Sequence, residues 1–221
     1  NGGQNWVSIG NSAYAVHFVN ENLGFVVGIS GRIAKTTNGG VNWTAQQFSG
    51  SPSLFTVYFS DSLKGWAAGT NLIIATIDGG AYWFTQNSGS GIRSLSFANA
   101  QTGYAAGYSG AILATTNAGL TWNFRSSKVT SEYLYGISFI NPLTGWIAGN
   151  NGTILKTTNG GVNYISQSLG MTNYVEAVHF INESTGWVAG SSGLIAKTTN
   201  GGTNWGFQNM GSAYIFSSLY F

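Results

Sequence analysis

A glycine followed by an aromatic residue recurs along the chain at nearly even intervals. The pair begins at residues 24, 65, 103, 145 and 186, so successive copies lie 38 to 42 residues apart. Each pair opens a short apolar segment that ends in glycine: GFVVG, GWAAG, GYAAG, GWIAG and GWVAG. Self-similarity at a fixed period of about 40 residues indicates a repeat architecture.

Three further segments recur in step with this pair. An alternating segment ending in Phe precedes it, and a segment ending in Thr-Thr, a turn and a segment beginning near Trp follow it. We name the four segments A (ending in Phe), B (Gly-aromatic), C (ending in Thr-Thr) and D (beginning near Trp). Four short strand-like segments per unit, separated by Gly, Asn and Ser, predict an all-β chain: a β-propeller of four-stranded antiparallel blades.

The order of the segments predicts a single propeller domain over residues 1–221, with spare segments at both ends. The chain starts with a D segment, NGGQNW, and ends with an A segment, FSSLYF. Since D is the outermost strand of a blade and A the innermost, the two cannot pair directly. Three arrangements stay open: five blades with redundant ends, self-association through the spare strands, or an excerpt of a longer natural or engineered array. The predicted units are residues 1–9 (partial), 10–48, 49–88, 89–127, 128–168, 169–209 and 210–221 (partial).

The turn between C and D, TTNGGVNW in its first copy, carries a physical reason for each residue. The Asn or Asp can accept hydrogen bonds from backbone N–H groups two or three residues on. The second glycine supplies the positive φ of a tight hairpin. The ring at the end can fill the gap between blades, which is worth about 3 kcal/mol or more by truncation costs. This predicts a structural role for Asn38, Gly40, Trp43, Asp78, Gly80, Trp83, Asn117, Gly119, Trp122, Asn159, Gly161, Tyr164, Asn200, Gly202 and Trp205.

This turn resembles the Asp-box of the BNR repeats found in sialidases and sortilin-type propellers. With Gly-Trp-x-Ala-Gly ahead of it, the whole unit is similar to the propeller repeats of the photosystem II assembly and stability factor family. That resemblance covers essentially the full chain and implies a propeller that docks other proteins. A sialidase-like glycoside hydrolase is the less favoured implication. The three arginines, Arg32, Arg93 and Arg125, do not match the carboxylate clamp of such enzymes, because only Arg93 is expected to face the channel.

Composition narrows the possible partners. Only 6% of the residues are charged and the net charge is +2, with no basic stripe, which argues against nucleic acid. Apolar runs such as residues 24–29 are too short to insert in a membrane. The uncharged polar surface favours an extracellular or bacterial cell-envelope location for a secreted protein. We predict no cofactor and no metal site, because His17 and His179, which share one place in the first and fifth units, lack a third ligand nearby.

Positions that differ between copies are free to serve a ligand. The second residue of segment A and the D–A loops vary most, and in a propeller they lie near the mouth of the central channel. We predict a noncatalytic interaction module that binds a protein or glycan there. Packing of the channel alone and a structural scaffold without a ligand are the alternatives. The candidate ligand-binding residues are Tyr14, Phe55, Arg93, Tyr133, Tyr135, Tyr174 and Glu176.

Overall fold

The structure, a computed structural model, describes residues 13–125, 129–208 and 214–220. It contains five four-stranded antiparallel sheets, each built from consecutive strands, which confirms the predicted β-propeller with four-stranded blades. The first blade is β1 (Ala13–Phe18), β2 (Gly24–Gly28), β3 (Arg32–Thr36) and β4 (Thr44–Gln47); the second is β5 (Leu54–Phe59), β6 (Gly65–Gly69), β7 (Leu72–Thr76) and β8 (Phe84–Ser88); the third is β9 (Ile92–Phe97), β10 (Gly103–Gly107), β11 (Ile112–Thr115) and β12 (Asn123–Phe124); the fourth is β13 (Leu134–Phe139), β14 (Gly145–Gly149), β15 (Ile154–Thr157) and β16 (Ile165–Gln167); the fifth is β17 (Val175–Phe180), β18 (Gly186–Gly190), β19 (Ile195–Thr198) and β20 (Gly206–Phe207).

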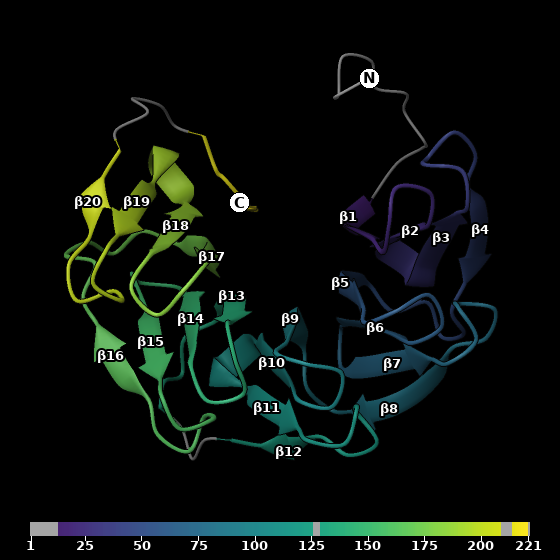
Figure 1. The fold of residues 1–221 in the computed structure, drawn as a ribbon, viewed down its shortest axis with the longest axis horizontal. Coiled ribbons are helices and arrows are strands. Elements are labelled where there is room, and N and C mark those ends of the chain that lie inside the picture. Colours follow the sequence, from purple (N-terminus) through teal and green to yellow (C-terminus); the bar gives the residue numbers. More distant parts are fainter. Residues whose placement is uncertain (1–12, 126–128, 209–213, 221) are drawn as a thin grey trace.

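The five blades form an open arc. Figure 1 shows the first strand of every blade on the inside, the fourth strand on the outside, and an opening between the first blade and the fifth. Residues 214–220 lie beside the fifth blade, where the Gly193 N–H donates to the Tyr214 carbonyl (2.7 Å) and the Phe216 N–H to the Gly190 carbonyl (3.1 Å). They occupy the place of a sixth A segment but form no strand. The predicted D segment in residues 1–6 lies outside the described residues, and the unit boundaries stay a prediction.

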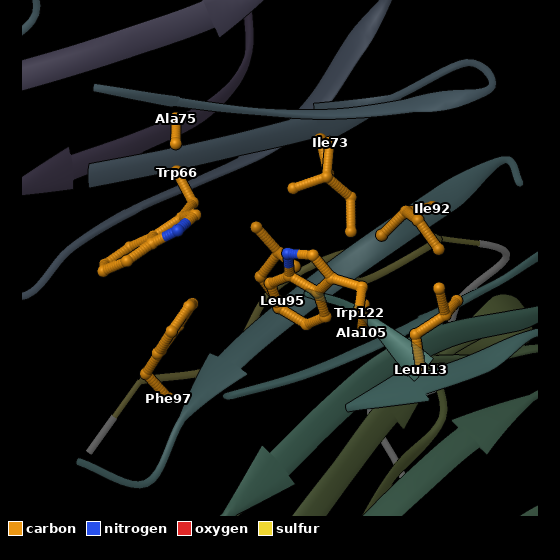
Figure 2. Close-up of a cluster of buried hydrophobic side chains, with 10 residues drawn as sticks. Trp66, Ile73, Ala75, Ile92, Leu95, Phe97, Ala105, Leu113 and Trp122 are labelled. Carbon is orange, nitrogen blue, oxygen red and sulfur yellow. The ribbon is translucent and has the colours of Figure 1, made fainter. Parts of the chain in front are cut away.

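The hydrophobic core lies between blades rather than at the centre of the arc. One cluster joins Phe25 and Ile33 of the first blade to Val57, Phe59 and Trp83 of the second. Figure 2 shows the next cluster, between the second and third blades. Two more clusters join the third blade to the fourth and the fourth to the fifth. Each cluster of buried apolar side chains therefore spans the boundary between two adjacent blades.

The Gly-aromatic pair contributes to the packing at each of these boundaries between blades. Phe59 of β5 pairs with Gly65 of β6, and its ring lies directly over that glycine. The other face of the Phe59 ring stacks on Phe25 of the preceding blade, with 3.7 Å between ring centroids. The three later boundaries repeat this stack at 4.1, 3.5 and 3.6 Å. The glycine makes room for the phenylalanine of its own blade, and the aromatic residue after it covers the phenylalanine of the next blade.

The turn between the third and fourth strands closes through its polar side chains. The buried Thr36 hydroxyl donates to Asn38 Oδ1 (3.0 Å) and accepts from the Gly40 N–H (2.9 Å). Asn38 Oδ1 also accepts from the Asn42 N–H (2.9 Å), four residues on rather than the predicted two or three. The difference arises because the Thr36 hydroxyl takes the Gly40 N–H and the Asn38 backbone carbonyl takes the Val41 N–H (3.4 Å). All five copies share the bonds of the threonine and of the Asn or Asp side chain, and the second glycine has φ between 79° and 92° throughout.

In later blades, the turn between the third and fourth strands also accepts hydrogen bonds from side chains of the preceding blade. Gln46 Nε2 donates to the Gly80 carbonyl (2.6 Å), and Lys35 Nζ donates to the Gly79 carbonyl (2.8 Å). Between the fourth and fifth blades, Gln167 Nε2 donates to the Gly201 carbonyl (2.8 Å). These hydrogen bonds make the turn part of the interface between neighbouring blades.

Replacing Gly65 with alanine tests the ring-over-glycine contact. A Cβ atom there would stand 2.5 Å from the Phe59 ring, which cannot retreat because Phe25 lies against its other face. We expect Gly65→Ala to destabilise the protein by about 1–3 kcal/mol, the usual cost of overpacking. Gly206→Ala is the control, since its Cβ would meet no atom closer than 3.7 Å. Urea unfolding of both variants measures the difference, and equal midpoints would contradict the prediction.

Candidate functional site

Five of the predicted ligand-binding residues line one cavity at the centre of the arc. The cavity has a volume of about 700 Å³, and its lining includes the second residue of the first strand in every blade. Ser217, Ser218 and Leu219 of the C-terminal segment add to the wall. The structure thus brings together Tyr14, Phe55, Arg93, Tyr135 and Glu176.

A β-bulge places each of these side chains. In the first blade, the pairing of β1 with β2 slips between Ala13 and Ala15, so Tyr14 is the extra residue. The same slip occurs in the other four blades. Bulges re-aim side chains out of a strand's alternation, and here they direct the extra residue into the channel. The bulge residues are Tyr14, Phe55, Arg93, Tyr135 and Glu176.

The glycine that ends each second strand belongs to this arrangement. A Cβ atom on Gly69 would collide with the Ser53 carbonyl, and one on Gly190 would collide with the Tyr174 carbonyl. Gly107 and Gly149 face the incoming chain in the same way. The conserved spacing of Gly-aromatic and terminal glycine within this chain thus signals the bulge, which sequence reasoning missed.

Arg93 is held between aromatic rings. Its guanidinium carbon lies 4.5 Å from the Phe55 ring centroid and 5.7 Å from that of Tyr135. Tyr14 also packs against Phe55, with 5.3 Å between ring centroids. A cation between two rings gains on the order of 0.5–2 kcal/mol from each, depending on its desolvation. The second, third and fourth blades are thereby joined by one charged group.

The two predicted loop tyrosines lie on the rim instead of in the cavity wall. Tyr174 contacts Tyr135 at 6.5 Å between ring centroids, and Tyr133 contacts Tyr108 at 5.0 Å. Tyr108 itself begins the turn η2 (Tyr108–Gly110) and also contacts Phe55 at 6.3 Å. The sequence prediction missed Tyr108, although the turns between second and third strands share this face. It is the one aromatic residue in the five turns, so comparing the copies there would have found it.

Burial is the main cause of the shifted pKa of Glu176, the carboxylate in the cavity. Desolvation raises the pKa of Glu176, and the positive charge of Arg93 partly opposes the rise. Desolvation also raises the pKa of Tyr135, and the negative charge of Glu176 raises it further. Tyr135 comes from the blade between those of Arg93 and Glu176, so the cavity has a cationic side and an acidic side.

The described residues show no group of three or more His, Asp or Glu side chains that could hold a metal ion. His17 packs on Tyr58, with 5.2 Å between ring centroids, and His179 lies 6.1 Å from the ring of Tyr220. Burial lowers the pKa of both histidines. In the part of the chain that the structure describes, no helix has the length and apolar character needed to cross a membrane.

Similar folds occur among solved structures with low sequence identity. A YCF48 bound to D1 peptide matches 88% of this chain at 17% identity, with a TM-score of 0.70. YCF48 from Cyanidioschyzon merolae matches 91% at 16% identity and 0.51, and an ancestral GH74 enzyme matches 92% at 17% identity and 0.77. This chain spans 66%, 86% and 32% of those three proteins, respectively. No curated protein matches it.

A family model decides the relationship. The model described as photosynthesis system II assembly factor YCF48 matches residues 85–169 and 126–213, which together make up more than half of the chain. Members of this family are assembly factors of the photosynthetic apparatus, in the thylakoid lumen or chloroplast. The predicted extracellular or bacterial envelope location is therefore wrong, because a low charge content does not distinguish such compartments. The resemblance to assembly-factor repeats is confirmed, and the chain belongs to the photosystem II assembly factor YCF48 family.

Proposed function

We propose that this chain is a noncatalytic propeller that binds an extended segment of a partner protein at the mouth of its channel. The observation that carries the proposal is Arg93, held between Phe55 and Tyr135 in the wall of a cavity of about 700 Å³. Arginine and tyrosine are, together with tryptophan, enriched among the residues that dominate binding energy at protein interfaces. Glu176, on the other side of Tyr135, offers the opposite charge to the same ligand.

The fold relatives support a peptide as the ligand. A YCF48 of similar fold has been solved bound to a D1 peptide. At 17% identity, and with this chain spanning 66% of that protein, the likeness shows the fold alone. Recognition of a peptide by the present chain is therefore part of the proposal, and it rests on the side chains of the channel mouth.

A glycan fits the cavity less well than a peptide. Aromatic rings do stack on sugars, but the Phe55 and Tyr135 faces turned toward Arg93 are occupied by its guanidinium. Hydrolysis of a glycosidic bond would require two carboxyl groups roughly 5–10 Å apart. Glu176 is the single carboxylate among the described residues that line the cavity. These observations favour binding of protein over binding or cleavage of sugar.

Fluorescence anisotropy with a labelled D1 peptide tests the proposal. We expect saturable binding that weakens at least about tenfold, or 1.4 kcal/mol, in Arg93→Ala and in Tyr135→Ala. Lys64→Ala and Tyr82→Ala are matched controls, because both side chains are exposed on turns at the other end of their blades. Binding that the two channel variants leave unchanged would overturn the site. Binding of oligosaccharides but not of the peptide would overturn the ligand class.

Exchange of Glu176 for glutamine tests the electrostatics of the cavity. Because burial raises its pKa above the ordinary value, the folded protein retains a proton that the unfolded chain releases. The wild type therefore loses stability as the pH rises from the ordinary pKa of Glu176 in the unfolded chain to its raised pKa in the folded protein. We expect Glu176→Gln to have the same melting temperature as the wild type at pH 4 and a higher melting temperature than the wild type at pH 7. The exposed Glu21→Gln is the control, and a lower melting temperature for Glu176→Gln at pH 7 would contradict the assignment.

A further inference from the structure

A group of aromatic rings borders the channel mouth and extends beyond the cavity wall. The ring centroid of Tyr108 lies 6.3 Å from that of Phe55 and 5.0 Å from that of Tyr133. The ring of Tyr174 lies 6.5 Å from that of Tyr135. These residues come from the second to the fifth blade and the loops that join them. We name this surface the tyrosine rim, which consists of Phe55, Tyr108, Tyr133, Tyr135 and Tyr174.

The rings of the rim meet at different angles from the rings of the core. Between the third and fourth blades, Tyr104 lies flat on Phe139, with 3° between the ring planes. The three ring pairs of the rim are inclined by 63°, 45° and 51°. Inclined rings do not cover each other's faces, and Tyr133 and Tyr174 are 46% and 48% exposed. The rim therefore presents aromatic surface to a ligand, whereas the core rings cover one another.

The rim also offers hydrogen-bond donors. The hydroxyl groups of its four tyrosines have no hydrogen-bond partner among the described residues. The core tyrosine Tyr104, in contrast, donates its hydroxyl proton to the Pro142 carbonyl (2.6 Å). A phenol combines an apolar ring with a donor that can pair with a backbone carbonyl of a ligand. The rim therefore complements a segment that has apolar side chains and carbonyl groups free of internal hydrogen bonds.

A polyproline II helix has this chemistry. It makes no internal hydrogen bonds, so its carbonyl groups are free, and proline holds this conformation before binding. Its rise of about 3.1 Å per residue amounts to about 6 Å over two residues, close to the 5.0–6.5 Å between neighbouring rings of the rim. Proline-rich segments dock on aromatic surfaces in this conformation in several classes of recognition domain.

A β-strand is a poorer occupant of the rim, although its rise per residue is similar. A strand is bound by free backbone groups of a sheet edge. At the rim, the Tyr133 and Tyr174 carbonyls already accept hydrogen bonds from the N–H groups of Asn150 and Ser191 (both 2.9 Å). The Tyr108 N–H donates to the Gly91 carbonyl (2.9 Å). Recognition at the rim therefore depends on side chains.

We propose that the segment bound at the channel mouth is a proline-rich polyproline II helix that carries an acidic residue. Its prolines lie on the tyrosine rim, and its carbonyl groups accept hydrogen bonds from the rim hydroxyls. Its carboxylate pairs with Arg93, the single Arg or Lys among the described residues that line the cavity. This inference rests on the proposed function, because it names the class of segment that the same site binds.

The probe is a labelled peptide of about ten residues, all proline except one central glutamate, which is long enough for about three turns of the helix. The matched peptide has alanine in place of every second proline and keeps the glutamate. By fluorescence anisotropy, we expect saturable binding of the proline peptide to the full chain and at least about tenfold weaker binding of the matched peptide. Exchange of the glutamate for lysine should also weaken binding.

Variants of the rim test where the peptide binds. We expect Tyr108→Ala and Tyr133→Ala each to weaken binding of the proline peptide at least about tenfold. Tyr133→Phe, which removes only the hydroxyl group, should weaken it less. Tyr82→Ala is the control, because that side chain is 68% exposed on a turn at the other end of its blade. A melting curve for each variant checks that it folds.

The outcomes separate this inference from the proposed function. Equal binding of the proline and alanine-containing peptides would overturn the inference, as would proline-peptide binding that folded Tyr133→Ala leaves unchanged. If the D1 peptide binds in a manner that depends on Arg93 and Tyr135 while the proline peptide does not bind, the inference falls and the proposed function stands. If neither peptide binds, both fall. The exposed Tyr133 carries the test if Tyr108→Ala fails to fold.

Discussion

The whole arc depends on one contact, the phenylalanine ring pressed between a glycine of its own blade and an aromatic ring of the blade before. Phe59 over Gly65 and under Phe25 is the first example. The glycine cannot carry a Cβ atom, and the ring cannot move without leaving its neighbour. Since each stack spans a boundary, the contact holds a blade together and joins it to the next at the same point. This explains why Gly-aromatic is the most regular feature of the chain.

Because the hydrophobic core lies between blades, the stability of each blade depends on the blades next to it. As in other repeat proteins, a unit that contacts only adjacent units gains most of its stability from its interfaces. The C-terminal segment, held through Phe216, caps part of the fifth blade. Val16 and Phe18 leave the first blade without one among the described residues. The equivalent residues of the other four blades are buried by the stacking that joins each blade to the one before it.

The sequence predicted what repeats and missed what depends on three-dimensional closure. Regular spacing was enough to predict the blades, the order of their strands and the left-handed glycines such as Gly40. Variation between copies was enough to select Arg93, Tyr135 and Glu176, which the structure brings to one cavity. The open arc could not be predicted, because identical blades can complete rings of different sizes. Tyr108 stands out only when the five turns between second and third strands are compared, because a single three-residue turn carries little pattern of its own.

The bulge explains how one repeat can keep its fold and change its surface. In each blade the residues on either side of the bulge pair with the second strand, while the terminal glycine lets the backbone pass. The bulge residue has no partner on the second strand. Its identity can therefore differ between blades, whereas the residues on either side of it must keep the pairing. Phe55, Arg93 and Glu176 can therefore occupy equivalent places without loss of the blade. Because all five bulges point into one channel, substitutions at these few positions set the chemistry of the channel mouth.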